Sequence, residues 1–288
     1  MKPLIVIVGE TSSGKSDIAI ELAEIINGEI INADSWAVYK EFNIGTAKVS
    51  KVDQNRVKHH LLDIAEPDKG FSAAEFKRLA IDAMEEIYKK DKVPILVGGT
   101  GLYIDSLLYD YSFLPPSTGD IRKYYEGLSL KELVKMCNEL NYDTNRIDLK
   151  NKRRVIRLLE NRGIFPESKP IRKNTLIVGI RINPKELAKR INSRTLKMID
   201  QGLENEVKHL INKYGWNIEP MKGIGYREFM DFFENKIDHG GLIDQINLDT
   251  LKLVKKQKTW FKRNKSIQWV DNRGDVVEVA TTFMNKFK

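Results

Sequence analysis

Residues 9–16 read Gly9-Glu10-Thr11-Ser12-Ser13-Gly14-Lys15-Ser16 and match the phosphate-loop pattern G-x-x-x-x-G-K-[ST] at every fixed position. An apolar, mostly β-branched run at 4–8 precedes the loop, and apolar residues at helical spacing follow it at 17–26. In this arrangement the backbone N–H groups, the lysine and the positive end of the helix converge on an oligophosphate. The segment therefore predicts an oligophosphate site with Mg²⁺ bound at Ser16, and it leaves the identity of the oligophosphate open.

The composition indicates a soluble globular protein, because 41% of the 288 residues are hydrophobic and 31% are charged. No apolar run approaches the length of a membrane span, and the chain enters its first strand without room for a signal peptide. The one cysteine, Cys137, cannot form a disulfide within the chain, and its helical context favours a buried small side chain over a nucleophile. We therefore expect a cytoplasmic protein that does not enter a membrane.

Strand and helix signals alternate along much of the chain. Short apolar runs predict strands at 4–8, 29–33, 94–97, 175–180 and 267–270. Helical patterns occur at 17–26, 72–90 and 102–108, and later at 184–214, 225–234, 242–264 and 276–287. This alternation predicts an α/β fold with a P-loop NTPase-like parallel sheet.

One segment interrupts this alternation. Pro115-Pro116-Ser117-Thr118-Gly119 is the clearest break in the chain, and the pattern beyond it is helical at 128–140 and 149–160. We therefore expect a helical insertion domain at 117–173 within an α/β core that comprises residues 1–116 and 174–288.

Two further strand ends carry polar residues. Asp34 and Ser35 follow the strand at 29–33, and Gly98-Gly99-Thr100 follows the strand at 94–97. In a parallel sheet the ligand lies outside the carboxyl ends of the strands, so these residues should meet the phosphate loop in one crevice. Asp34 would there hold Mg²⁺ or take a proton from a nucleophile, with a capping or turn role as the alternative. For Thr100 a simple Gly-Thr-Gly turn is the alternative.

Two other motifs are weaker. Asn43-Ile44-Gly45-Thr46-Ala47-Lys48 is a second loop of small residues that ends in a lysine. His59 and His60, with Asp63, suggest a metal site, but adjacent histidines diverge and no cysteine pair supports zinc. We therefore do not expect a metal there.

The net charge is +8, which permits a nucleic-acid partner without establishing one. Basic residues form two clusters: Lys150, Lys152, Arg153, Arg154 and Arg157, and then Lys252, Lys255, Lys256, Lys258, Lys262, Arg263 and Lys265. Trp260 and Phe261 lie among the second set, which suits a surface for phosphates and bases. A solvated helix with its rings in the core is an equal alternative. Arg190 and Arg194, four residues apart on one expected helix, would extend the nucleic-acid surface.

Several motifs taken together resemble the tRNA dimethylallyltransferases, also called tRNA isopentenyltransferases. They occur in the family's order and span most of the chain. The matching pieces are Gly9–Ser16, Asp34-Ser35-x-x-Val38-Tyr39, Asn43–Lys48, His59–Asp63, Phe71–Phe76, Gly98–Tyr103, Lys152-Arg153-Arg154-x-x-Arg157, Gly223–Glu228 and Gln257-x-Thr259-Trp260-Phe261.

The resemblance implies a reaction and its partners. A dimethylallyl group would pass from dimethylallyl diphosphate to N6 of the adenosine directly 3′ of the anticodon, in tRNAs that read codons beginning with U. The partners would be this donor and the tRNA anticodon stem-loop, with tRNA bound by the C-terminal helices. We expect the protein to be a monomer. The target adenine would be flipped out of its stack to reach the site.

The resemblance also implies roles for residues. Asp34 would be the base, and Lys15 and Mg²⁺ at Ser16 would stabilise the leaving diphosphate. Thr100 would help to position substrate at its phosphate end. Arg122 would enter the site and meet either the diphosphate or the tRNA. The diphosphate would be held by Gly9, Glu10, Thr11, Ser12, Ser13, Gly14, Lys15 and Ser16. The implied tRNA contacts are Asp34, Ser35, Trp36, Ala37, Thr100, Arg122, Arg153, Arg154 and Arg157.

The chain departs from the family pattern in places. Ala37 stands where many members have glutamine, and the basic helix after Thr250 lacks an arginine and a tyrosine. No Cys/His zinc module of the eukaryotic kind follows, so we expect a bacterial type. The alternatives are a small-molecule kinase that uses ATP, an adenylate isopentenyltransferase, and a non-catalytic RNA-binding protein with a vestigial loop.

Overall fold

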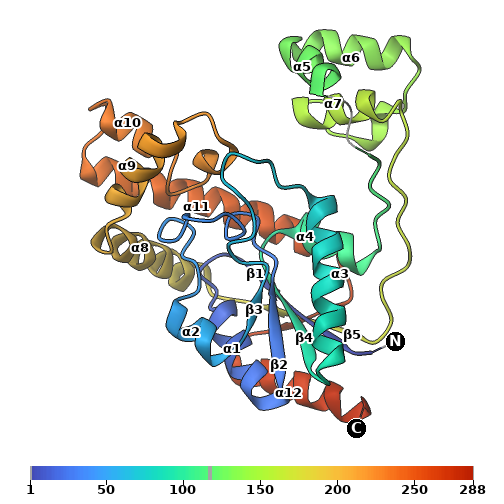
Figure 1. Ribbon diagram of the computed structural model, residues 1–288, viewed down its shortest axis with the longest axis vertical. Coiled ribbons are helices and arrows are strands. Elements are labelled where there is room, and N and C mark those ends of the chain that lie inside the picture. Colours follow the sequence, from blue (N-terminus) through green and yellow to red (C-terminus); the bar gives the residue numbers. More distant parts are fainter. Residues whose placement is uncertain (1, 116–118, 288) are drawn as a thin grey trace. The chain divides into compact units, whose positions relative to one another are not determined.

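The computed structural model describes residues 2–115 and 119–287, and it divides them into two compact units (Figure 1). The larger unit holds a six-stranded, wholly parallel sheet of order β3-β2-β4-β1-β5-β6. Its strands are β1 (Leu4–Gly9), β2 (Gly28–Asn32), β3 (His59–His60), β4 (Val93–Gly98), β5 (Thr175–Ile180) and β6 (Ile267–Val270). The predicted α/β fold with a P-loop-like parallel sheet is therefore confirmed. The edge strand β3 was not predicted, because two residues are too few to show a hydrophobic period.

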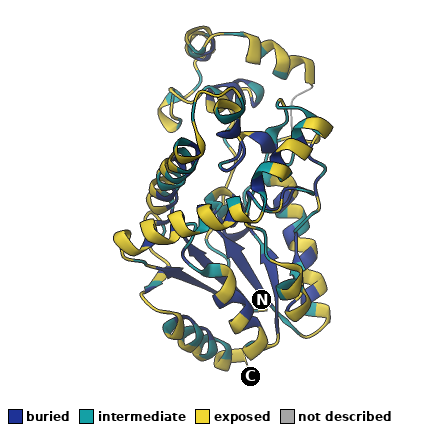
Figure 2. Cartoon of the chain, turned by 90° about the vertical axis from the view of Figure 1, so that its left-hand side faces the viewer, coloured by how far each residue is buried: buried dark blue, intermediate teal, exposed yellow. Residues whose placement is uncertain are grey.

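Helices cover both faces of this sheet. On one face α1 (Lys15–Ile26) and α12 (Arg273–Met284) pack over Ile5, Ile7 and Val178 in a shared core. On the other lie α3 (Ala73–Lys89), α4 (Gly101–Leu108) and α11 (His239–Phe261), where α4 contacts both other helices and the three together contact strands β1, β2 and β4. Figure 1 shows α1 and α3 on opposite sides of the sheet. The strands between them are buried, as Figure 2 shows, which explains their continuous apolar sequences.

A second core lies in the larger unit beyond the carboxyl ends of the strands. It joins Phe42 and neighbouring loop residues to a helical group whose central side chains include Tyr226 and Phe229. This group consists of α8 (Pro184–Asp200), α9 (Leu203–Tyr214), α10 (Phe229–Phe233) and part of α11. The short helix α2 (Lys51–Arg56) follows the loop at 43–48 in the sequence. The sheet edge that carries the predicted site residues is therefore built against helices from the C-terminal half.

Two helix predictions in this group were wrong. The helix expected at 184–214 is split in two, because Gly202 adopts the left-handed conformation (φ +92°) and caps the start of α9. The helix expected at 225–234 is limited to α10. Gly225 is also left-handed (φ +91°), and its N–H donates to the carboxylate of Glu228 at 2.8 Å, so the chain turns there instead.

The smaller unit spans Tyr109–Ile171 and has its own apolar core around Leu133, Cys137 and Val155. Its helices are α5 (Gly119–Gly127), α6 (Leu130–Glu139) and α7 (Lys152–Glu160). Burial raises the pKa of the Cys137 thiol, as expected of a small core side chain.

The unit is longer at its start than the insertion domain predicted at 117–173, and residue 117 itself lies outside the described residues. The entering and leaving segments hydrogen-bond to each other, from Ser112 N–H to Glu167 O (3.0 Å) and from Lys169 N–H to Tyr109 O (2.7 Å). These bonds bring residues 109–115 into the smaller unit, although their sequence has no helical pattern.

In the part of the chain that the structure describes, no helix combines the length and apolar character needed to cross a membrane.

Candidate active site

The phosphate loop connects β1 to α1 as the sequence predicts. Gly14 caps α1 in the left-handed conformation (φ +85°), and Ser12 also has a positive φ of 62°. The Ser13 N–H donates to Glu10 O at 3.2 Å, which closes the turn. Only glycine adopts the conformation of Gly14 without strain, so the second fixed glycine of the motif is explained by the backbone itself.

Lys15 folds back over this loop. Its Nζ donates to Glu10 O at 2.5 Å and to Ser13 Oγ at 3.4 Å. Burial lowers the pKa of Lys15 to about 8, while Asp34 and Glu10 act in the opposite direction and Arg194 adds to the lowering. A bound anion would stabilise the ammonium form, so this lysine is electrostatically prepared for an oligophosphate.

Ser12 supplies a second sign that the loop expects a ligand. Its Oγ is buried and has no hydrogen-bond partner. Buried hydroxyls in native proteins are nearly always paired, so an unpaired one beside backbone N–H groups indicates a group that binds there.

The carboxyl ends of β2 and β4 are linked to each other beside the loop. Thr100 Oγ1 accepts from Ser35 N–H at 3.0 Å and donates to Ser35 Oγ at 3.2 Å. Gly98 permits this approach, because a Cβ there would lie 2.2 Å from the backbone oxygen of Ala33. Asp34 uses one carboxylate oxygen, Oδ1, to accept from Trp36 N–H at 2.9 Å. Thr100 is therefore more than a turn residue, and Asp34 is held in one orientation.

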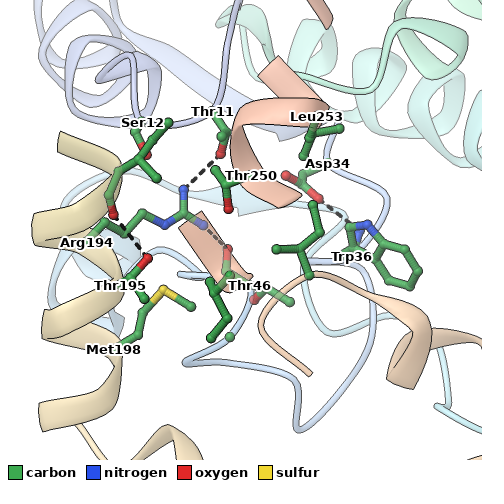
Figure 3. A pocket seen from close by; sticks show the side chains of 14 residues that line it. Thr11, Ser12, Asp34, Trp36, Thr46, Arg194, Thr195, Met198, Thr250 and Leu253 are labelled. Carbon is green, nitrogen blue, oxygen red and sulfur yellow. Dashed lines mark hydrogen bonds between the residues drawn. The ribbon is translucent and has the colours of Figure 1, made fainter. Parts of the chain in front are cut away.

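Asp34 lines a first cavity next to the phosphate loop (Figure 3). It has about 590 Å³ of space, counted to include its opening to solvent. The phosphate loop, the segment around Asp34, the loop at 43–48, α8, Ile224 and α11 contribute to its lining, and α8 and α11 each supply both polar and apolar side chains. The polar set is Thr11, Ser12, Asp34, Thr46, Arg194, Thr195 and Thr250, and the apolar set includes Trp36, Ile191, Met198, Ile224, Ile246 and Leu253. A ligand with an anionic head and a short apolar chain matches both sets.

A second cavity of about 670 Å³, again counted with its opening, lies on the β4 side of Asp34. Its lining differs in kind, because it includes two indole rings, a lysine and the glycine-rich loop after β4. It is formed by Asp34, Ser35, Trp36, Gly99, Thr100, Gly101, Leu102, Leu253, Lys256, Gln257 and Trp260. Asp34, Trp36 and Leu253 line both cavities, so the carboxylate of Asp34 stands where the two spaces meet.

The structure corrects the prediction for Arg194. It was expected on a nucleic-acid surface with Arg190, but its guanidinium lies in the first cavity and donates to Thr11 Oγ1 at 2.9 Å and Thr46 O at 3.3 Å. Arg190 instead pairs with Glu186 on the surface of α8. A helical projection would have shown the difference, since Arg194 shares its face with the buried Ile191 and Met198.

In the sequence Gln257 stands out only as part of the Gln257-x-Thr259-Trp260-Phe261 motif. It is a buried residue on the helix that also carries the second basic cluster, and it contacts both the phosphate loop and the turn after β4. Its neighbour on the same face, Trp260, donates from Nε1 to Asp105 Oδ2 at 2.8 Å. Of the rings of this cluster, Trp260 thus lines the second cavity and Phe261 is buried, while the lysines of α11 are exposed.

The arginines predicted in the insertion separate into two kinds. Arg122 and Arg157 both pair with the carboxylate of Glu160, at 3.1 and 3.3 Å, and Glu160 is almost fully buried. Arg157 also donates to Leu114 O at 2.6 Å. Arg153 and Arg154 are exposed on α7. Within the smaller unit, therefore, two of the predicted arginines brace its fold and two are accessible.

The remaining predicted residues have these positions. Ser35, Trp36 and Thr100 line the second cavity with Asp34, whereas Ala37 is buried. Ser16 is exposed at the start of α1 and borders a further space with Asp17. His60 is paired with the buried Glu29, with 2.7 Å between His60 Nε2 and Glu29 Oε2.

The second small-residue loop has a structural explanation. The N–H groups of Asn43, Ile44 and Gly45 donate to the carboxylate of Glu206 at 2.9–3.1 Å. Tyr226 donates to the same carboxylate at 2.8 Å, and its ring lies where a Cβ on Gly45 would be. An acidic side chain of the protein thus occupies the donors of this loop.

Comparison with known proteins agrees with this geometry. The sequence model of the IPP transferase family matches residues 37–264. The chain is a member of the IPP transferase family. The matched range begins after the phosphate loop and Asp34. The geometry of those residues is therefore evidence that is independent of the family match.

Relatives of this IPP transferase cover nearly its whole length. The tRNA dimethylallyltransferase of Anoxybacillus flavithermus is 37% identical over 95% of this chain and 92% of its own. The structure of a tRNA isopentenylpyrophosphate transferase from Staphylococcus epidermidis is 34% identical, with a TM-score of 0.75 and full coverage of both chains. A eukaryotic dimethylallyltransferase, crystallised acting on tRNA, is 25% identical with a TM-score of 0.80, covering 94% of this chain and 74% of that one.

Proposed function

We propose that this IPP transferase transfers a dimethylallyl group from dimethylallyl diphosphate to N6 of the tRNA adenosine directly 3′ of the anticodon, and releases diphosphate. The tRNAs are those that read codons beginning with U. One observation carries the proposal: the carboxylate of Asp34 stands between a cavity suited to a prenyl diphosphate and a cavity suited to a base.

The donor fits the first cavity. The phosphate loop N–H groups, Lys15 and Arg194 would hold its diphosphate, and Ser12 Oγ would gain the partner that it lacks. The apolar side chains around Met198 and Ile246 would enclose the branched hydrocarbon chain. Because negative charge grows on the diphosphate as the allylic C–O bond breaks, these fixed cations stabilise the transition state more than the ground state.

The acceptor fits the second cavity. An exocyclic adenine amine is a weak nucleophile, since its lone pair is delocalised into the ring. Asp34, oriented by the Trp36 N–H, would accept the proton that the amine loses as its bond to the allylic carbon forms. The indole rings of Trp36 and Trp260 offer stacking faces for a base that has left the anticodon loop.

We include Mg²⁺ in this proposal because the residues present suit it. Mg²⁺ takes oxygen ligands, and Ser16 offers an exposed hydroxyl at the end of the phosphate loop. When bound, the ion would neutralise part of the charge on the diphosphate. The Ser16 hydroxyl would be its ligand from the protein, with diphosphate oxygens and water as the others.

The RNA would be held by exposed cations. Lys252, Lys255 and Lys258 project from α11, whose buried face borders both cavities. Arg153 and Arg154 add exposed charge in the smaller unit. We propose that these cations bind the anticodon stem-loop of a tRNA in the cytoplasm, with the chain acting as a monomer, because a single chain supplies the lining of both cavities.

One assay tests the reaction and its alternatives. The purified protein is incubated with Mg²⁺, radiolabelled dimethylallyl diphosphate and either unmodified tRNA or AMP. Label in tRNA at the adenosine 3′ of the anticodon supports the proposal. Label in AMP would identify an adenylate isopentenyltransferase, phosphorylation from ATP would identify a kinase, and RNA binding without transfer would identify a non-catalytic protein.

A further inference from the structure

Gln257 forms hydrogen bonds with two loops, the phosphate loop and the turn after β4, whose relative position matters for the proposed reaction. Its Oε1 accepts from the N–H of Thr11 in the phosphate loop at 2.9 Å. Its Nε2 donates to the carbonyl oxygen of Gly99, after β4, at 3.2 Å. The residue is 91% buried, since only 9% of its surface is exposed, and water therefore competes little for these bonds.

These bonds extend into a continuous series across three neighbouring strand ends. On one side Thr11 is also held through its hydroxyl by Arg194 from α8. On the other, Gly99 precedes Thr100, whose hydroxyl binds Ser35 next to Asp34. The side chain of Gln257 is thus the link between the donor end of this series and the acceptor end.

The site for this amide is built into the backbone. An added Cβ on Gly99 would lie 2.3 Å from Nε2 of Gln257, and one on Gly101 would lie 2.2 Å from the ring of Trp260. Two glycines therefore allow α11 to approach the end of β4 closely enough for the amide to reach both loops. Neither a shorter side chain nor an ionised carboxylate would bond to both, because one loop offers an N–H and the other a carbonyl.

We propose that Gln257 is a positioning residue for prenyl transfer, which fixes the phosphate loop relative to Asp34. The inference rests on the proposed function, because the distance that matters is the one between a bound prenyl diphosphate and the amine that Asp34 deprotonates. Misplacing reacting groups by about 1 Å costs on the order of 10²-fold in rate. Gln257 would thereby make the basic helix α11 part of the catalytic framework as well as of the RNA surface.

The first test is Gln257→Ala, compared with Gln268→Ala on the exposed side of β6 as the matched control. We expect kcat to fall by about 10²-fold, the KM for dimethylallyl diphosphate to rise a few-fold, and the affinity for the anticodon stem-loop to stay within about twofold of wild type. Gln268→Ala should behave as wild type in all three. Normal turnover of a folded Gln257→Ala variant, or an equal loss of RNA affinity, would overturn the inference.

The second test separates positioning from a general loss of packing. Gly99→Ala should displace the side-chain amide of Gln257, because the new methyl group would lie 2.3 Å from Nε2 of Gln257. It should therefore reproduce the defect of Gln257→Ala. If both changes break one link, the double variant should be no slower than either single variant, with thermal midpoints recorded for all three. If the rate losses of the two single variants instead multiplied, to about 10⁴-fold in the double variant, the two changes would act independently, and the inference that both break the Gln257 link would be contradicted. The wild-type protein is assayed alongside the variants. If it transfers the dimethylallyl group, a negative result with the variants counts against the role of Gln257 and not against the proposed function.

Discussion

The larger unit contains two loops rich in small residues, each with a lysine at or next to its end, and the N–H groups of the two loops differ in what they bind. In the loop at 9–16 a buried serine hydroxyl lacks a partner, and the pKa of Lys15 is lowered to about 8 by burial, against the opposing effect of Asp34. In the loop at 43–48 the N–H groups bind Glu206, and Lys48 donates to Asp63 at 2.5 Å. Similar sequences thus form one loop prepared for a ligand and one already filled by the protein.

The difference teaches what a loop motif does and does not specify. Backbone N–H groups that point into one concave space will bind an anion, but the anion can be a side chain from elsewhere in the chain. Each loop also has a carboxylate nearby, and these differ in the same way. Asp63 contacts Lys48, whereas Asp34 and Lys15 form no direct ion pair among the described residues. Asp34, the carboxylate that forms no ion pair with the lysine of its loop, is the one that lines both the first and the second cavity.

The largest effect is expected at the two carboxylates. Asp34→Asn should reduce kcat by about 10²- to 10⁴-fold, because an amide cannot accept the proton of the amine, while tRNA affinity stays nearly unchanged. Asp63→Asn is the matched control, and it should lower stability without a comparable loss of kcat. Single-turnover rates and tRNA binding measure both variants. Near-normal turnover by Asp34→Asn would remove this carboxylate from the mechanism.

The two lysines provide the next comparison. Lys15→Met should weaken the binding of inorganic pyrophosphate by about 10²-fold, as expected for the loss of a charge-assisted contact, and Lys48→Met should not. The pKa of Lys15 is lowered to about 8, so its ammonium form is lost as the pH rises through that value. The difference in affinity between wild type and Lys15→Met should therefore shrink above pH 8. Calorimetric titrations at several pH values measure it, and a constant difference would contradict the assignment.

The loop at 43–48 can be tested by removing the carboxylate of Glu206, which its N–H groups bind. Glu206→Ala leaves three N–H groups and Tyr226 without their acceptor, and should lower the free energy of unfolding by about 2–3 kcal/mol. Glu204→Ala, on the same helix, removes only a surface pair with Lys208 and should cost less than about 1 kcal/mol. Urea unfolding measures both.

Added formate sharpens this test. If the loop at 43–48 is an anion site in its own right, formate should raise the stability of Glu206→Ala more than that of wild type, because it can occupy the vacated donors. Equal responses of the two proteins would show that the loop needs Glu206 for its shape, and the parallel between the two loops would then fail.

Much of this arrangement was predictable from the sequence, because its signals are local. The phosphate loop, five of the strands and the polar residues after β2 and β4 each lie within a few residues of the pattern that reveals them. Asp34 and Thr100 could be placed in one crevice, since parallel strands share a carboxyl edge. The break between α8 and α9 was also local, but a single glycine inside a helical pattern is a weak signal.

The unpredicted part depends on residues that are distant in sequence. Arg194 lies 183 residues from Thr11, and Gln257 lies 246 residues from it, so no local pattern places either side chain at the phosphate loop. The same holds for Glu206, which lies more than 160 residues from the loop it fills. A lysine-rich helix predicts a charged surface, but which of its uncharged residues face inward depends on the packing of other segments.

The smallest effect is expected at the arginines of α7, where one arginine is paired within the protein and another is exposed. Within residues 2–115 and 119–287, no ion pair of the exposed Arg154 is found, whereas Arg157 is engaged by Glu160 and Leu114. If Arg154 meets an RNA phosphate, Arg154→Ala should weaken binding of the anticodon stem-loop less than about tenfold and reduce the slope of log affinity against log salt by about one. Arg157→Ala should instead lower stability, because it leaves a buried carboxylate with one partner fewer. Fluorescence anisotropy across a salt series, with thermal unfolding of both variants, distinguishes the two roles. An unchanged slope for Arg154→Ala, or a reduced slope with full stability for Arg157→Ala, would mean that the occupied arginine and the exposed one have been assigned the wrong way round.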